Sequence, residues 1–183
     1  MPSSETHNHI VKSYDDEQRA LLDELIRMGE MAVAQLEAAL DVVERRDDKA
    51  AERVMANDDA IDALEQQVNH DVIRLIRRGP MATDLRVILA ALRVAADIER
   101  IGDYAANIAK RSIALNQTPP LPHTRGLEAL GRMAAQQMRE VMRAYVARDG
   151  EAALRVRERD AELDTLYTGL FLVVALDDVI VGF

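Results

Sequence analysis

The chain of 183 residues contains no cysteine and no tryptophan. Without cysteine, disulfides, thiolate catalysis, zinc fingers and iron–sulfur clusters are excluded. Aromatic residues make up only 3% of the chain, too few for a β-sandwich or a β-barrel. Glycine and proline number only 8 and 5, whereas good helix formers such as Ala, Leu, Glu and Arg are abundant. These shortages predict an all-α fold, and the absence of cysteine fits a reducing compartment.

Positive charge is also scarce, because 23 Lys and Arg against 32 Asp and Glu leave a net charge of −9. Nucleic-acid binding depends on a basic face, so we expect no nucleic-acid partner. The N-terminal residues lack the apolar core of a secretory signal. The longest apolar runs, such as 170–176, are far shorter than the ~20 residues that cross a bilayer. We therefore expect a cytoplasmic protein with no direct membrane insertion.

Apolar residues recur at steps of three and four along most of the chain, the spacing of amphipathic helices. The first three helices are joined by short turns, and short turns force neighbouring helices to be antiparallel. The proline-rich stretch 116–125 is the natural boundary after them. The spacing predicts helices at about 10–45, 48–77, 83–115, 126–147 and from 150 to at least 170. The predicted domains are a three-helix bundle over 10–115, a linker over 116–125 and a second bundle over 126–183.

An internal repeat supports two bundles. With a shift of 102 residues, segment 29–65 matches segment 131–167 at thirteen positions, among them Arg46/Arg148 and Asp47/Asp149. Chance would give roughly three or four matches in so alanine-rich a chain. The fourth and fifth helices therefore repeat the first and second.

The repeat also predicts a gap. A counterpart of the third helix would begin near residue 185, so we expect the second bundle to lack its third helix. The fourth and fifth helices would then carry uncovered apolar faces, and such faces are association surfaces. The segment 171–183 adds an apolar, β-prone tail. We expect self-association into a homo-oligomer through residues 126–183, or a loosely packed second half.

Pairs of acidic residues spaced four apart stand on several predicted helices. Asp58 and Asp62 form one pair on the second helix, and Glu99 and Asp103 form another on the third. Like charges at this spacing destabilise a helix unless something compensates them. Two neighbouring helices with such pairs can hold a hard cation, such as Mg²⁺, Mn²⁺ or oxidised iron. The first pair recurs on the fifth helix as Asp160 and Asp164.

Two other interpretations stay open from the residues alone. Acidic pairs are common on solvated helix faces, where Arg53, Arg100 and Lys110 would neutralise them, so a metal-free helical scaffold fits as well. A di-metal carboxylate enzyme is disfavoured, because its Glu-x-x-His motif is absent. Nucleophile-elbow and phosphate-loop motifs are absent too. We therefore predict a protein without catalytic residues.

Four segments of the chain carry distinctive motifs. The most specific is the long stretch 82–110, ATDLRVILAALRVAADIERIGDYAANIAK, with its E-R-I-G-D. The others are ELIRMGEMA at 24–32, the D-x-A-I-D-x-L-E segment at 58–65 and RDAELDTLY at 159–167. Together these segments resemble the PhoU family of phosphate-transport regulators. The resemblance extends over nearly all of 14–170 and ends at about Leu170.

The resemblance implies two tandem three-helix bundles, a dimeric or higher assembly and repression of the phosphate-starvation response. It implies contact with the ATPase subunit of the phosphate importer and with the phosphate-sensing histidine kinase. It further implies clusters of iron, or of manganese, magnesium or zinc, on E/D-x-x-x-D motifs. Those motifs fall on Asp58, Asp62, Glu99 and Asp103 in the first repeat, and on Asp160 and Asp164 alone in the second. Since a sixth helix is expected to be missing, the second repeat offers only one acidic pair for a metal site.

Overall fold

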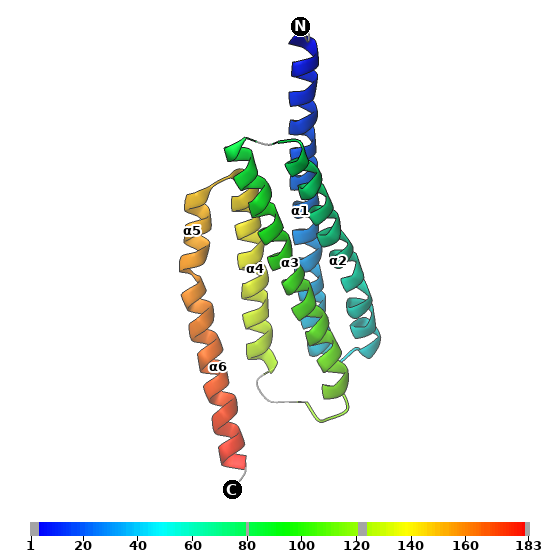
Figure 1. Ribbon diagram of the computed structural model, residues 1–183. Helices are drawn as coiled ribbons and strands as arrows, with labels where there is room; N and C mark the ends of the chain where they lie inside the picture. The colour runs from blue at the N-terminus through cyan, green and yellow to red at the C-terminus, as the bar shows by residue number, and fades with distance from the viewer. Residues whose placement is uncertain (1–3, 80, 121–123, 182–183) are drawn as a thin grey trace.

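The chain folds as a set of long helices in the computed structural model, which describes residues 4–79, 81–120 and 124–181 (Figure 1). Within these ranges there are six helices and no strand. The all-α fold class is therefore confirmed. The helices are α1 (Ser4–Arg45), α2 (Asp48–Arg77), α3 (Ala82–Leu115), α4 (Thr124–Ala147), α5 (Gly150–Glu158) and α6 (Asp160–Val181).

The first three helices pack against one another as an antiparallel bundle, with α3 lying against both α1 and α2. Their shared core is made of apolar side chains at helical spacing, because each helix buries one stripe. The side chains buried most completely there include Leu25, Met28, Ile61, Leu75 and Ile88. α1, α2 and α3 thus share one packed core.

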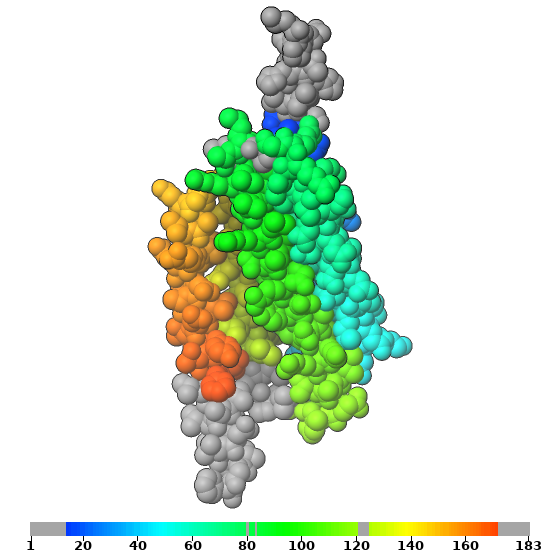
Figure 2. All heavy atoms as spheres, viewed as in Figure 1, coloured from blue at the N-terminus to red at the C-terminus, as the bar shows by residue number. Residues whose placement is uncertain are grey.

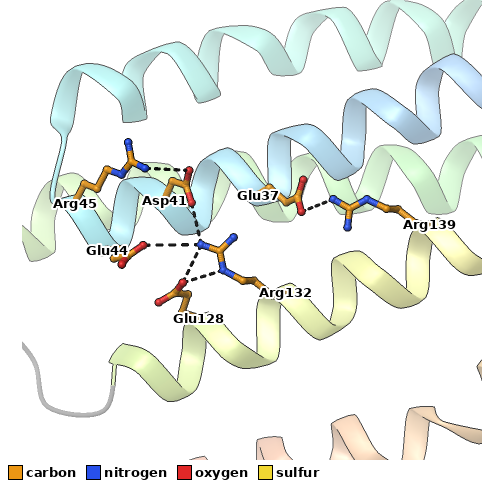
Figure 3. Close-up of polar contacts among 7 residues, drawn as sticks. All are labelled: Glu37, Asp41, Glu44, Arg45, Glu128, Arg132 and Arg139. Carbon is orange, nitrogen blue, oxygen red and sulfur yellow. Dashed lines mark hydrogen bonds and ion pairs between the residues drawn. The ribbon is translucent and has the colours of Figure 1, made fainter.

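The fourth helix joins this bundle through α1 alone, and α5 and α6 pack on α4. Charged pairs line the α1–α4 contact, as Figure 3 shows: Arg132 Nη2 lies 3.1 Å from Asp41 Oδ1, and Arg139 pairs with Glu37. Among the described residues, neither α5 nor α6 contacts α2 or α3. One side of α4 therefore faces the space between α3 and α5 (Figure 2).

The prediction of one continuous helix from 150 to at least Leu170 was wrong at Arg159, where α5 ends and α6 begins. The Arg159 carbonyl accepts a hydrogen bond from Gln137 Nε2 at 3.2 Å, and the Arg159 guanidinium pairs with Glu140. Both partners belong to α4, so the break is held by tertiary contacts. Periodicity within one segment carries no signal for such contacts.

The two ends of the chain also differ from expectation. The helix that was predicted to begin near Ile10 begins at Ser4. The segment after Leu170, predicted to be β-prone, continues as helix through Val181. In the described parts of the chain, none of the helices has a stretch long and apolar enough to cross a bilayer.

Candidate functional site

Four acidic side chains from α2 and α3 gather on one face of the first bundle. Asp58 and Asp62 stand one turn apart on α2, and Glu99 and Asp103 stand one turn apart on α3. The two pairs are neighbours, because a Cβ built on Gly102, the residue before Asp103, would lie 3.2 Å from Asp58 Oδ1. The structure therefore brings together the four residues that the sequence predicted as one site.

The close approach of the two helices depends on Gly102, the glycine of the E-R-I-G-D motif. A Cβ built on Gly102 would lie 3.0 Å from Ile61 Cδ1 and 3.2 Å from Asp58 Oδ1. A larger residue there would push α3 away from α2. Because glycine has no side chain, α3 can approach α2 closely enough to place Glu99 and Asp103 beside the α2 carboxylates.

Sequence reasoning missed Gln35 of α1 as a member of this site. Its Nε2 donates hydrogen bonds to Asp58 Oδ1 at 2.7 Å and to the Gly102 carbonyl at 3.2 Å. One buried side chain therefore ties all three helices together at the acidic cluster. The signal available in the sequence was repetition, because Gln35 recurs as Gln137 in the second repeat.

The surroundings of the cluster raise the pKa of Asp58, Asp62 and Glu99. Burial, followed by the nearby carboxylates, raises the pKa of Asp62 and of Glu99 above their ordinary values. Burial likewise raises the pKa of Asp58, and the hydrogen bond from Gln35 partly opposes that rise. The negative charge of Asp103 contributes to the raised pKa of all three groups. The cluster is a region of concentrated negative potential.

Close ion pairs with basic side chains are not seen in this region among the described residues. Within the described residues, no ion pair joins Arg53, Arg100 or Lys110 to the acidic cluster, and Arg100 hydrogen-bonds to the Tyr104 hydroxyl instead. Glu65 adds a further carboxylate, which accepts a hydrogen bond from Asn69 Nδ2 at 2.7 Å. An excess of carboxylates without ion-paired cations is the composition of a site for a hard cation.

The residues present fit such a cation in donor chemistry. All donors are oxygens, and Asp62 Oδ1 is buried without a hydrogen-bond partner, so a cation would satisfy it. The present rotamers are not those of a metal site, because the described part of the chain contains no group of three His, Asp or Glu side chains arranged to hold an ion. Binding at this site would require these side chains to rotate.

The second predicted pair lies elsewhere. Asp160 and Asp164 are exposed on the first turns of α6, which packs on α4 and α5. Among the described residues no acidic pair from a facing helix meets them. The structure thus separates these two residues from the four of the first repeat.

Comparison with known proteins agrees with this architecture. A family model described as "PhoU domain" matches residues 25–112 and 127–177, which extends past Leu170, where we expected the likeness to end. The phosphate-specific transport system accessory protein PhoU homolog of Xylella fastidiosa strain 9a5c is 68% identical over 163 residues, covering 89% of this chain and 69% of that protein. The phosphate-specific transport system accessory protein PhoU of Escherichia coli K12 is 29% identical over 93% of this chain and 71% of its own length.

The fold itself also has a solved counterpart. The crystal structure of PhoU from Pseudomonas aeruginosa superposes with a TM-score of 0.87 at 26% sequence identity. The superposition covers 91% of this chain and 80% of that one. Tandem helical bundles are thus shared by this chain and a solved structure.

Proposed function

This chain belongs to the PhoU domain family, and on that premise we propose that it is an accessory regulator of phosphate transport that acts by protein–protein contact. The observation that carries the proposal is the 68% identity to a phosphate-specific transport accessory protein over 89% of the chain. In this role the chain represses phosphate uptake and the phosphate-starvation response when phosphate is plentiful. It works in the cytoplasm, and it has no catalytic activity.

Its partners in this proposal are the ATPase subunit of the phosphate importer and the phosphate-sensing histidine kinase. The net charge of −9 suits docking on basic patches of such partners, since complementary charge steers association. The acidic cluster of α2 and α3 is one concentrated source of that charge. The same proposal includes assembly of the chain into a homo-oligomer, because part of the α4 surface is exposed.

We propose further that Asp58, Asp62, Glu99 and Asp103 bind iron, manganese, magnesium or zinc. The oxygen donors and the unpartnered Asp62 Oδ1 support this assignment. The bound cation would stabilise the contact between α2 and α3 by offsetting the repulsion among the carboxylates. The pair Asp160 and Asp164 would contribute a second site only with ligands from another helix.

Complementation tests the regulatory proposal. An Escherichia coli K12 strain without its own PhoU would receive this chain, and phosphate uptake and a phosphate-starvation reporter would be measured in phosphate-rich medium. We expect the chain to lower both, with the strain's own PhoU as the positive control. The proposal would be contradicted if the reporter stays fully active while the chain is present at normal levels and pull-downs capture neither partner.

The metal-free scaffold remains the second candidate, and one observation favours it: the present rotamers of the acidic cluster do not form a metal group in the described residues. It predicts complementation without bound metal. Metal analysis of protein purified at neutral pH therefore separates the two. A di-metal carboxylate enzyme has no such observation in its favour.

A further inference from the structure

Large apolar side chains are exposed where α2 turns into α3. Near the end of α2, Ile73 is 52% and Ile76 is 38% exposed. Met81, just before α3, is 75% exposed, and Leu89 of α3 is 45% exposed. Single exposed apolar residues are ordinary, but several in one short stretch are typical of an interaction site. We call these four residues the apolar patch.

The apolar patch continues the face of the first bundle that carries the acidic cluster. On α2, Ile76 stands fourteen residues after Asp62, and on α3, Leu89 stands fourteen residues before Asp103. Steps of seven residues return to nearly the same side of a helix. Because α2 and α3 are antiparallel, both steps lead toward the turn that joins them. Ile76 and Leu89 therefore lie on one face, about 21 Å along the helices from the carboxylates.

The exposure of this face is a property of the first bundle. Among the described elements, α2 and α3 contact only each other and α1. In Figure 2 the two helices lie side by side, with no described element in front of them. The three helices share one packed core, and the apolar patch lies outside it.

Three arginines border the apolar patch. Arg77 stands four residues after Ile73, while Arg86 and Arg93 stand three residues before and four residues after Leu89. At these spacings, side chains are neighbours on a helix surface. All three arginines are exposed, and within the described part of the chain none of them forms an ion pair. Their charges are therefore available to a partner.

The segment around the turn has a charge opposite to that of the whole chain. Residues 71–93 contain five arginines and two aspartates, whereas the net charge of the chain is −9. Two of these arginines already have acidic partners, since Arg74 pairs with Asp71 at 2.8 Å and Arg78 pairs with Glu17 of α1. The positive potential that remains comes from the three arginines beside the apolar patch.

We propose that the apolar patch and these three arginines bind an acidic amphipathic helix of a partner protein, which lies along the outer face of α2 and α3. Apolar side chains of that helix cover the patch, and its Asp and Glu side chains pair with Arg77, Arg86 and Arg93. About fourteen residues of helix fit between the turn and the acidic cluster.

The acidic cluster favours a narrow partner over a membrane. A broad anionic surface laid on this face would also meet Asp62, Glu99 and Asp103, and these carboxylates would repel it. A single helix ends before it reaches them. The site is distinct from the contact with basic patches that the net charge favours, and it requires neither bound metal nor a role in phosphate transport.

A labelled synthetic helix tests the proposal. The probe is a peptide of about fourteen residues with leucines at steps of three and four and glutamates on both flanks of that stripe. The control peptide keeps the leucines and has glutamine at every glutamate position. Fluorescence anisotropy would follow binding to the full chain. We expect saturable one-to-one binding of the probe that weakens as salt is added, and binding of the control peptide at least tenfold weaker.

Variants of the arginines locate the binding site. Arg86→Gln with Arg93→Gln should weaken binding of the probe by about tenfold, because two ion pairs are lost. Arg53→Gln with Arg157→Gln is the matched control, since it removes two exposed arginines outside the patch. This control should leave the affinity unchanged.

A variant of the apolar patch tests the other half of the contact. Leu89→Gln should weaken binding by about tenfold or more, because it removes apolar area that the probe would cover. Leu154→Gln makes the same change at a 54% exposed leucine of α5 and should have no effect. Circular dichroism would check that all variants remain helical.

Four outcomes would overturn the proposal. The first is an absence of saturable binding by the probe to the folded chain. The second is an equal loss of affinity in the patch variants and their controls, because the probe would then bind elsewhere. The third is binding to phosphatidylserine vesicles, but not to the probe, that the patch variants lose. The fourth is a dimer in sedimentation that Leu89→Gln dissociates, because the occupant would then be a second copy.

Discussion

Gly131 of α4 packs so closely against Leu40 of α1 that a Cβ on the glycine would lie 2.5 Å from Leu40 Cδ2. The repeat supplies the counterpart of this contact, since a Cβ on Gly29 of α1 would lie 2.9 Å from Met142 Cε of α4. Adding 102 converts Gly29 to Gly131 and Leu40 to Met142. The α1–α4 contact therefore exchanges equivalent residues, as in an interface between two copies of one helix.

Replacing Gly131 should weaken the packing of α4 against α1. Gly131→Val would drive a branched side chain into Leu40, which is buried, and we expect a loss of about 1–3 kcal/mol of unfolding free energy. Chemical denaturation measures the change. Gly169→Val on α6 is the matched control, because nothing lies within 4 Å of a Cβ there. Equal stability of the two variants would contradict the close contact.

Arg46 should contribute to the free energy of unfolding, whereas its repeat counterpart Arg148 should not. Arg46→Met removes the hydrogen bonds to the carbonyls at the end of α3, and we expect a loss of about 1 kcal/mol because these bonds are partly exposed to water. Arg148→Met removes no such bond within the described residues, so its unfolding free energy should match that of the wild type. Thermal melts of both variants would check this, and an equal loss in both would refute the assignment.

Local sequence patterns predicted most of the fold. Apolar periodicity placed α2 at the bounds that the structure shows, and the acidic spacing selected the four carboxylates that meet between α2 and α3. These features succeed because they depend on the helix repeat itself. The predicted domain boundary in the linker stays a prediction.

Tertiary contacts account for what the patterns could not supply. The break at Arg159 depends on Gln137 and Glu140, which lie on another helix. Gln35 joins the acidic cluster from α1, 23 residues before Asp58 in the chain. The side-chain rotamers, which decide whether carboxylates surround a cation, are likewise set by packing and have no periodic signal.

A carboxyl pair between α1 and α2, formed by the half-buried Glu24 and the buried Asp71, should make stability depend on pH. Burial, followed by the charge of Asp71 and a hydrogen bond with it, raises the pKa of Glu24, and Arg74 partly opposes the rise. The folded protein therefore binds the Glu24 proton more tightly than the unfolded chain does. This contribution is present below the ordinary glutamate pKa of about 4.3 and is lost as pH rises through the higher folded value.

Glu24→Gln should remove that contribution and flatten the stability profile. We expect the variant to gain on the wild type as pH rises from about 4 toward neutrality, where an ionised Glu24 faces Asp71. Urea denaturation at a series of pH values would measure this difference. Glu30→Gln changes an exposed glutamate of the same helix and is the control. Parallel pH profiles for Glu24→Gln and the wild type would rule out a raised Glu24 pKa.

The acidic cluster should respond to charge removal in opposite ways with and without metal. In metal-free buffer the double variant Glu99→Gln, Asp103→Asn should be more stable than the wild type by a few tenths to about 1 kcal/mol, because neighbouring carboxylates repel one another. With manganese or iron added, the wild type should gain stability and retain metal through gel filtration, and the double variant should do neither. Asp160→Asn with Asp164→Asn removes the same number of charges from exposed positions on α6, so it should retain metal as the wild type does. If wild type and both variants bind no manganese, iron, magnesium or zinc, the four carboxylates serve as a charged surface and the metal-free scaffold is correct.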